Sequence, residues 1–376
     1  MLLSDDHQAV QDAVREFVQA EIAPHAAAWD KSGQFPAAQL RGLAALGCYG
    51  VAVPTEYGGA GLDYLALALM IEEIAAGDGA TSTIVSVNNC PVCSILMAFG
   101  NEDQKQRFLK PLARGDMLGA FCLTEPHVGS EAGGLKTSAV LEGDEYVLNG
   151  VKQFITSGKN GDVAIVMAVT DKAAGKRGIS AFLVPTTTSG YVVARVENKM
   201  GQHASDTAQI LFDNCRVPAA NRIGDEGQGL KIALSGLEGG RIGIASQALG
   251  MARAAFEVAL AYSKDRQAFG VPIFQHQAVQ FKLADMATQI EATRQLIWHA
   301  ACLKDAGRPC LKEAAMAKLM ASEMAEAVCS GAIQVLGGYG YLSDFPVERI
   351  YRDVRVCQIY EGTSEVQKIL IGRALA

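Results

Sequence analysis

The sequence predicts a multidomain α+β protein in which an N-terminal α-helical domain and a C-terminal four-helix bundle flank a central antiparallel β-domain. Apolar residues recur at helical spacing up to about residue 119, short apolar segments separated by turn residues follow, and long helical patterns return after residue 224. The chain has 376 residues, 49% of them apolar, which is enough for two or three cores. We therefore expect domains at 1–119, 120–224 and 225–376.

The N-terminal domain has the pattern of amphipathic helices. Val10, Val14, Phe17 and Ile22 share one helical face, and this pattern stops before Pro24. Further helices are expected over the segments 62–76 and 104–112.

The central domain has the pattern of a meander of short strands. Strands are expected over 138–140, 146–148, 151–155, 163–169, 179–184, 191–193 and 210–212. Gly143-Asp144 and Asn149-Gly150 are two-residue hairpin signals between the early strands. Consecutive hairpins predict an antiparallel sheet, not the parallel sheet of a dinucleotide-binding fold.

Long helices are expected again in the C-terminal domain, over 232–263, 276–306 and 311–336. A closing helix follows Gly362, with Thr363 or Ser364 as its N-cap. Each is long enough to cross a bundle, and many small residues (Ala, Gly, Ser) permit close packing, so a four-helix bundle is expected.

Composition excludes several classes of protein. A net charge of -7 argues against a nucleic-acid binder, which is usually basic. The longest apolar run, at 64–71, is far shorter than the about 20 residues that a membrane span needs. The nine cysteines are an odd number and predict free thiols in a reducing compartment, so a cytoplasmic location is the default, or the mitochondrial matrix for a trimmed organellar form. The lone CxxC at 90–93 is interpreted as a packed helix turn, and the isolated histidines favour no metal site.

The segment QIYEGTSE at 358–365 carries the most chemistry. Glu361 follows an apolar Ile-Tyr pair, and apolar surroundings raise the pKa of a carboxyl group and make it a better base at neutral pH. Gly362 leaves room for a ligand to approach the backbone, and the helix start favours an anion. The alternative is a solvated glutamate in a tight turn before a terminal helix.

Four motifs occur in order along the chain: LTEPHVGS at 123–130, RQAFG at 266–270, QVLGG at 334–338 and IYEGTSE at 359–365. With the α-β-α order, they resemble the acyl-CoA dehydrogenase family of flavoproteins over essentially the whole chain. One departure is HVGSE at 127–131, where the family more often has a small residue followed by Ala-Gly-Ser-Asp. The segment at 351–353 is also familiar in the family and is interpreted as a buried ion-pair scaffold.

The resemblance implies non-covalently bound FAD and the α,β-dehydrogenation of a fatty or branched acyl-CoA thioester to the trans-2-enoyl-CoA. It implies that Glu361 is the catalytic base and that its backbone N–H is a donor to the thioester oxygen. A minority of the family carries the base at the position of Gly240, and glycine cannot remove a proton. The texture of 229–376 is closest to members acting on short or short branched acyl chains. An electron-transfer flavoprotein is the implied electron acceptor, and a homotetramer (a dimer of dimers) is the implied assembly, without nucleic-acid or membrane partners.

The same resemblance assigns binding residues. The FAD contacts it implies are Phe121, Leu123, Thr124, Ser130, Phe154, Ile155, Thr156, Arg266, Phe269, Gln277, Gln334, Gly337, Gly338, Thr363 and Glu365. The implied substrate contacts are Ser130, Glu238, Arg241 and Gly362. Arg266 would hold the FAD pyrophosphate, often of a neighbouring subunit. Ordinary alternatives are a half-buried strand at 154–156, a turn serine at 130, a solvated helix-end arginine at 266 and a helix C-cap at 337–338.

Three rival functions remain open at this point. An acyl-CoA oxidase shares the fold and the base but passes electrons to oxygen, although the chain is too short for the additional C-terminal domain of the large oxidases. A non-enzymatic relative that binds nucleic acid is opposed by the acidic net charge and by Glu361. A flavoenzyme acting on nitroalkanes would favour aspartate at the base position.

Overall fold

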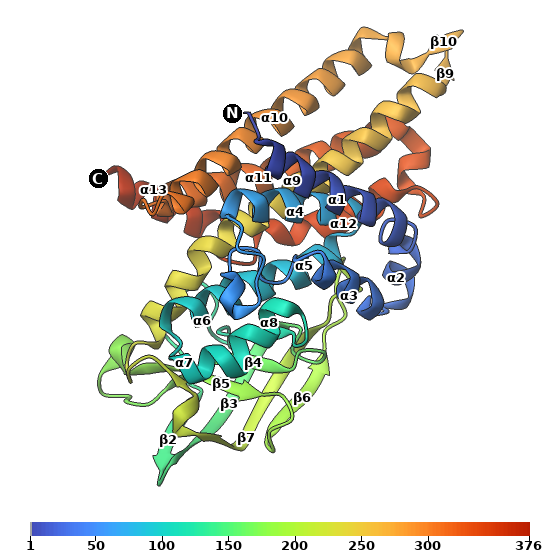
Figure 1. Ribbon diagram of the computed structural model, residues 1–376. Coiled ribbons are helices and arrows are strands. Elements are labelled where there is room, and N and C mark those ends of the chain that lie inside the picture. The colour runs from blue at the N-terminus through green and yellow to red at the C-terminus, as the bar shows by residue number, and fades with distance from the viewer. Residues whose placement is uncertain (1) are drawn as a thin grey trace.

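Helices from both ends of the chain lie together on one side of a large sheet that the middle of the chain forms (Figure 1). The structure is a computed structural model and describes residues 2–376. The helices before the sheet are α1 (Asp5–Glu21), α2 (Ala26–Ser32), α3 (Ala37–Ala45), α4 (Tyr64–Gly77), α5 (Gly79–Val87), α6 (Ser94–Phe99), α7 (Glu102–Gln104) and α8 (Lys110–Arg114). The helices after it are α9 (Gly229–Asp265), α10 (Gln277–Asp305), α11 (Leu311–Leu336), α12 (Pro346–Val354) and α13 (Ser364–Leu375).

The central sheet contains β1 (Gly119–Cys122), β2 (Ser138–Glu142), β3 (Glu145–Thr156), β4 (Val163–Val169), β5 (Ile179–Pro185), β6 (Tyr191–Val196), β7 (Thr207–Pro218) and β8 (Arg222–Ile223). Its order is β6-β7-β3-β2-β4-β5-β8, with β1 beside β4. Most pairs are antiparallel, as predicted, but β4 pairs in parallel with β1 and, at one residue, with β2. The four residues of β1 were not predicted as a strand, because so short a segment has no periodicity of its own.

The Gly143-Asp144 hairpin is confirmed between β2 and β3, whereas the hairpin predicted at Asn149-Gly150 is wrong. Residues 145–156 form one strand that pairs with β7 throughout, and the Asn-Gly dipeptide is a bulge in it. Gly150 has a φ of 150°, and a Cβ there would lie 2.6 Å from the Cα of Thr137. The glycine is therefore needed for close approach of the backbone and not for chain reversal.

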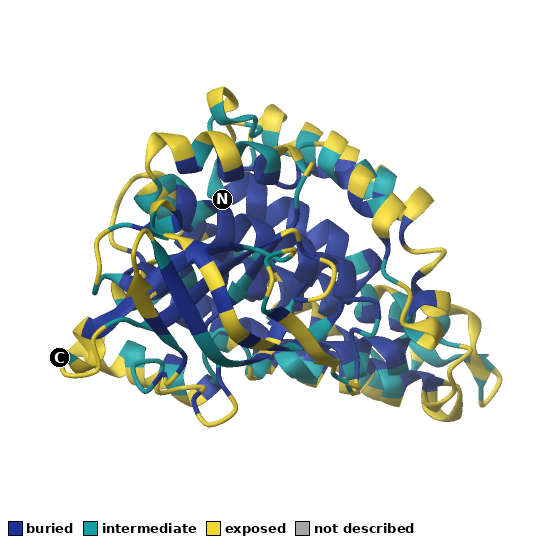
Figure 2. Cartoon of the chain, turned by 90° about the horizontal axis from the view of Figure 1, so that it is seen from below, coloured by how far each residue is buried: buried dark blue, intermediate teal, exposed yellow. Residues whose placement is uncertain are grey.

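The sheet and the helices share a core through β4. Val163, Ile165 and Met167 face the N-terminal helices, while Ala164 and Val166 belong to a second cluster on the other face of the sheet. A strand covered on both faces is apolar at every position, which explains the uninterrupted run of apolar residues at 163–169. The buried strands and helices are dark in Figure 2.

The C-terminal helices form the predicted bundle. The three long predicted helices are confirmed as α9, α10 and α11, which pack against one another, while α13 packs against α11. Helix α4 of the N-terminal segment also packs along α9, so the bundle core includes residues from both ends of the chain.

The segment Gly79–Phe99 is long and apolar enough to cross a membrane by length and composition, with a mean hydropathy of 1.4. Because 72% of that window is buried inside the fold, its apolar surface is used in packing as in a core helix. The CxxC at Cys90 and Cys93 lies in this segment, and both thiols are free and buried. The cysteines therefore have the packing role that the sequence predicted.

Candidate functional site

The turn before α13 places Glu361 in an unusual backbone conformation. Glu361 and Gly362 have φ values of 53° and 92°, so two successive residues lie in the left-handed region. Thr363 then begins the helix as its N-cap, and its hydroxyl accepts the N–H of Val366. A non-glycine residue at positive φ is costly, and such strain is concentrated at functional sites.

The carboxyl group of Glu361 is buried against α9. Its Oε2 atom is inaccessible to solvent and has no hydrogen-bond partner among residues 2–376. A Cβ added to Gly240 would lie 2.1 Å from this oxygen and 2.6 Å from the carboxyl carbon. Burial raises the pKa of Glu361 to about 8, although the positive charges of Arg241 and Lys318 lower it. A carboxyl group with this pKa is matched to proton abstraction near neutral pH.

Two buried cations lie near the carboxyl group of Glu361. Arg241 is 4% exposed, and its Nε and Nη1 atoms have no hydrogen-bond partner among the residues that the structure describes. Burial lowers the pKa of Arg241, and the charges of Glu361 and Glu238 oppose this shift. Lys318 of α11 has no exposed surface and donates from Nζ to the carbonyl oxygen of Gly362 at 2.7 Å. Sequence reasoning missed Lys318, since one lysine in an apolar helix is usually a solvated residue.

The backbone N–H of Glu361 is left available by this turn. Within residues 2–376, it donates no hydrogen bond to the backbone or to a side chain, whereas the carbonyl oxygens of Glu361 and Gly362 both accept from Gln367 Nε2, at 3.1 and 2.8 Å. A base and a free N–H on the same residue can act together on a carbonyl compound. The base removes an α-proton while the donor binds the oxygen on which negative charge develops.

A second group of predicted residues lies on the sheet. Ile155 is buried, and Phe121, Thr124 and Thr156 are half-buried on β1, β3 and the loop after β1. Phe154 is 63% exposed and has a φ of 61°, because the pairing of β3 with β7 slips between Lys152 and Ile155. The bulge turns an aromatic ring outward, which is not the ordinary half-buried strand that the sequence alternation would give.

The loop after β1 is held by an ion pair that sequence reasoning missed. Lys152 Nζ lies 2.8 Å from Glu125 Oε1 and donates to the carbonyl oxygen of Leu123 at 3.1 Å. Both charged side chains are buried, and the Glu125 carboxylate also accepts the N–H groups of Lys136 and Thr137. These bonds fix the two ends of the loop at 123–137, on which the predicted contacts at 123, 124 and 130 lie. Ser130 itself is exposed.

Glu238 also lies on α9 and already has protein partners. Its Oε1 atom is 3.1 Å from Lys304 Nζ and accepts from Cys310 Sγ at 3.4 Å. A contact from Glu238 to substrate stays a prediction, and its carboxylate would have to share these partners.

The remaining predicted cofactor contacts lie at the far end of the bundle. Strands β9 (Gln267–Ala268) and β10 (Val271–Pro272) form a hairpin whose two turn residues, Phe269 and Gly270, both have positive φ. Phe269 is 97% exposed, and Gln277 and Gln334 are also exposed. Arg266 lies 5.7 Å from the ring of Tyr339, and both line a cavity of about 460 Å³ with Gly337 and Gly338.

The predicted cofactor contacts therefore form two separate groups within one chain. The hairpin of β9 and β10 lies at the opposite end of the molecule from the sheet that carries the residues of β1 and β3 (Figure 1). Thr363 and the exposed Glu365 lie at the start of α13, close to Glu361 in sequence.

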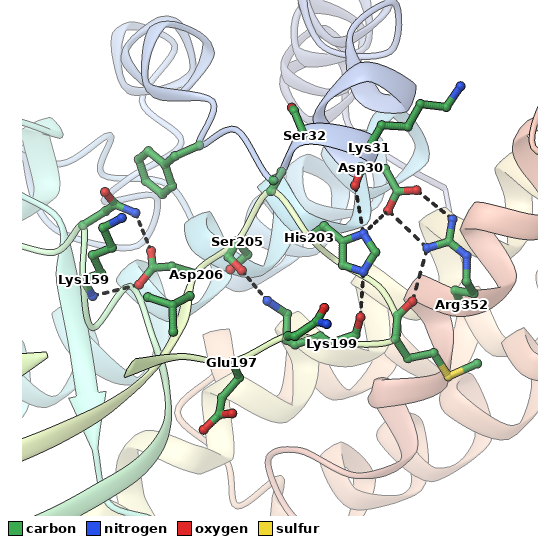
Figure 3. A pocket seen from close by; sticks show the side chains of 17 residues that line it. Asp30, Lys31, Ser32, Lys159, Glu197, Lys199, His203, Ser205, Asp206 and Arg352 are labelled. Atoms are coloured by element: carbon green, nitrogen blue, oxygen red, sulfur yellow. Dashed lines mark hydrogen bonds and ion pairs between the residues drawn. The ribbon is translucent and has the colours of Figure 1, made fainter. Parts of the chain in front are cut away.

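A larger cavity of about 810 Å³ lies between α2, the segment joining β6 to β7, and α12, and none of the predicted site residues lines it (Figure 3). Several of its charged groups pair with one another or with the backbone. Asp30 pairs with Arg352 at 2.7 Å and with His203 at 2.8 Å, and Lys199 Nζ donates to the carbonyl oxygen of Ser205 at 2.6 Å. For Arg352, this is the ion-pair scaffold expected at 351–353.

Comparison with known proteins gives a consistent result along the chain. Residues 4–116, 120–215 and 227–376 match the family models for the N-terminal, middle and C-terminal domains of acyl-CoA dehydrogenase. The chain is 48% identical to the human protein named short-chain specific acyl-CoA dehydrogenase, mitochondrial, over 98% of this chain and 90% of that protein. It is 46% identical to an acyl-CoA dehydrogenase of Bacillus subtilis (strain 168), over 100% of this chain and 99% of that protein.

Solved structures agree with the sequence relatives. Butyryl-CoA dehydrogenase from Megasphaera elsdenii superimposes with a TM-score of 0.97 at 43% identity, covering 100% of this chain and 99% of that chain. A chain from work on the electron transferring flavoprotein of Acidaminococcus fermentans gives a TM-score of 0.98 at 45% identity, with the same coverage. The chain therefore belongs to the acyl-CoA dehydrogenase family and is an oxidoreductase.

Proposed function

We propose that the protein catalyses the FAD-dependent α,β-dehydrogenation of a short acyl-CoA thioester, with Glu361 as the base. The observation that carries this proposal is the buried carboxyl group of Glu361, which has a pKa of about 8, no hydrogen-bond partner at Oε2 within residues 2–376, and a free backbone N–H on the same residue. Buried acids of this kind, poised to titrate near the working pH, are typical of general bases.

In the proposed reaction, the chain orients the thioester and moves one proton. The N–H of Glu361 binds the thioester oxygen and stabilises the negative charge that develops there. The Glu361 carboxylate removes a proton from the α-carbon, and the β-carbon loses a hydride, so that a double bond forms between the two carbons. FAD, when bound, accepts the hydride. Burial of the carboxyl group keeps the base desolvated.

The residues present fit FAD if two copies of the chain build each site. The exposed ring of Phe154 and the polar Thr124 and Thr156 suit the edge and face of a flavin. The cavity with Arg266, Gly337 and Gly338 suits a pyrophosphate, because a guanidinium binds phosphate in a bidentate manner and the glycines leave space. Since these groups lie at opposite ends of one chain, we propose that the second group serves the FAD of a neighbouring subunit. The nearly fully exposed Phe269 supports a partner at this tip.

We propose butyryl-CoA or a similarly short or branched thioester as substrate, an electron-transferring flavoprotein as electron acceptor and a homotetramer as the assembly. The short-chain and butyryl-CoA dehydrogenases among the relatives support the chain length. The similarity to a chain from work on an electron transferring flavoprotein supports the acceptor. We also propose a location in the cytoplasm or in the mitochondrial matrix. The domain boundaries are proposed at 119–120 and 224–225.

Anaerobic titration of the FAD-loaded protein tests this proposal directly. Acyl-CoAs of four, eight and sixteen carbons and isobutyryl-CoA are added, the flavin absorbance is followed, and the products are separated. We expect the most rapid bleaching with the four-carbon thioesters, together with stoichiometric 2-enoyl-CoA. A purified protein that takes up no flavin would contradict the proposal. Rapid formation of hydrogen peroxide in air, with product bound, would instead indicate the acyl-CoA oxidase.

A further inference from the structure

Lys318 is a buried charge that the proposed reaction does not use. It lies in the first third of α11, has no exposed surface, and yet carries an ammonium group. Burying an unpaired charge is costly, so a buried lysine is expected to have a strong partner. No carboxylate among residues 2–376 lies at ion-pair distance from Nζ, and its bond at 2.7 Å goes instead to the carbonyl oxygen of Gly362.

The carbonyl oxygen of Gly362 is the centre of a small network. It accepts from Lys318 Nζ and from Gln367 Nε2, and the same amide group also reaches the carbonyl oxygen of Glu361. Gln367 is fully buried on α13. One donor from α11 and one from α13 therefore hold two successive carbonyl groups of the turn. A hydrogen bond with a charged donor is roughly twice as strong as a neutral one.

These bonds act on the strained part of the backbone. Both Glu361 and Gly362 have positive φ, a conformation that a glutamate adopts at a cost of order 1–3 kcal/mol. Such a turn persists only where its surroundings determine it. The carbonyl groups point toward Lys318 and Gln367, and the N–H of Glu361 is left without a partner among the described residues.

We propose that Lys318 is a positioning residue that, together with Gln367, holds the turn at Glu361 and Gly362 so that the carboxylate and the N–H of Glu361 face the substrate together. This inference rests on the proposed function. It adds that the geometry of the base is set by a buried ammonium group on a different helix and not by the turn sequence alone.

The charge of Lys318 also acts on Glu361. The charged and titratable groups around Lys318 are Glu361 and Glu365 next to the turn, Arg241 on α9 and Cys357 before the turn. Burial lowers the pKa of Lys318 to about 8, and the charge on Lys318 in turn lowers the pKa of Glu361. Removing this cation should therefore raise the pKa of Glu361 and move the rise of activity to higher pH.

The test compares Lys318→Met, Gln367→Met and the control Lys312→Met in the FAD-loaded protein. Methionine is unbranched, keeps the length of glutamine, is one atom shorter than lysine, and removes the donor. Lys312 lies on the same helix, is partly exposed, and pairs with Glu313, so its replacement changes the net charge equally without touching the turn. For Lys318→Met we expect kcat for butyryl-CoA to fall by about 10²-fold, the loss typical of a misplaced reacting group, with KM nearly unchanged. The pH profile should move to higher pH, and Gln367→Met should lower kcat without this move.

Hydrogen exchange of the amides at 360–363 gives a readout that does not depend on activity. We expect faster exchange there in Lys318→Met and Gln367→Met than in the wild type, and no change in Lys312→Met. The inference is overturned if Lys318→Met matches Lys312→Met in kcat, pH profile and exchange. If Lys318→Met does not fold, the Gln367→Met variant provides the test. The inference is then overturned if Gln367→Met has the kcat and the hydrogen exchange of the wild type. A wild type that dehydrogenates no acyl-CoA contradicts the proposed function instead, whatever the exchange shows.

Discussion

The carboxyl group of Glu361 occupies the space that a side chain at residue 240 would need. A Cβ on Gly240 would lie 2.1 and 2.5 Å from the two carboxyl oxygens, distances at which one of the groups must move. The glycine inside this 37-residue helix is thus explained by the carboxyl group that packs on it, at a cost of about 1 kcal/mol in helix propensity. Residues 121 positions apart in sequence form one site, and either position could present a carboxylate to the same space.

Gly240→Ala tests this relationship. The new methyl group should push the Glu361 carboxylate away from α9, and we expect kcat to fall by about 10²-fold, with FAD content unchanged. The control is Gly372→Ala in α13, where an added Cβ meets nothing within 4 Å. That variant should retain wild-type kcat in steady-state assays. Wild-type kcat in Gly240→Ala would show that the carboxylate has another position from which it can act.

Glu361→Gln should abolish proton abstraction while preserving the fold, because the amide has the same shape as the carboxyl group. We expect the variant to bind FAD and acyl-CoA but to lose flavin bleaching by 10²–10⁴-fold or more in anaerobic stopped-flow absorbance. Glu323→Gln is a suitable control, since Glu323 is on α11, about half exposed, and paired with Lys368 at the surface. Bleaching of Glu361→Gln at the wild-type rate would require a different base.

The pH dependence of the reaction follows from the raised pKa of Glu361. Below about 8 the carboxyl group is protonated and cannot accept a proton, so kcat/KM should rise about tenfold per pH unit up to this value. The measurement is kcat/KM for butyryl-CoA between pH 6 and 9.5 at constant ionic strength. A flat profile over this range would contradict a base that is buried and protonated at neutral pH.

The sequence predicted the elements that have strong periodicity. Helices α9 to α11, the β2–β3 hairpin and the cap at Thr363 follow from patterns within a few residues. The role of Glu361 stays a prediction, which came from its apolar neighbours together with the family resemblance. The features that were missed depend on contacts between distant segments. The pair of Glu125 and Lys152 joins a loop to a strand 27 positions away, and Lys318 reaches Gly362 across 44 positions.

The wrong hairpin at Asn149-Gly150 has the same origin. An Asn-Gly pair between apolar segments is a strong local turn signal, but the pairing of β3 with β7 keeps the chain extended through it. The outward position of Phe154 has the same cause, since it depends on the slip in pairing between the same two strands. Register is decided by the partner strand, and one sequence segment does not contain that information.

Arg266→Gln tests whether the predicted cofactor contacts near the hairpin of β9 and β10 contribute to FAD binding. Loss of a bidentate guanidinium contact to phosphate should weaken FAD binding by about 10–100-fold, measured by fluorescence titration of the apoprotein. Arg308→Gln, at an exposed arginine in the connection between α10 and α11, removes the same charge and should leave the affinity unchanged. Equal affinities for FAD in the two variants would show that Arg266 does not contact the cofactor.

The final prediction concerns Asp353, a carboxyl group buried below the site. It accepts the backbone N–H of Gln202, and burial, with the nearby charge of Asp78, raises its pKa from the ordinary value of 3.8, which applies to the unfolded chain, to about 7. A carboxyl group whose folded pKa is higher than its unfolded pKa stabilises the fold while it is protonated. Its contribution is complete below about pH 4 and is lost as the pH rises to 7.

Between pH 5.5 and 7 this linkage should lower the stability of the wild type by up to about 2 kcal/mol, since one proton is released on unfolding across that range. Asp353→Asn removes the titration and keeps an acceptor for Gln202, so its melting temperature should depend less on pH than that of the wild type. Asp344→Asn, at an exposed position before α12, is the matched control and should follow the wild type. The comparison is made by calorimetry of the FAD-loaded protein at fixed concentration. An equal slope in Asp353→Asn and wild type would mean that Asp353 is ionised in the folded protein at pH 5.5, stabilised by Arg349 despite its burial.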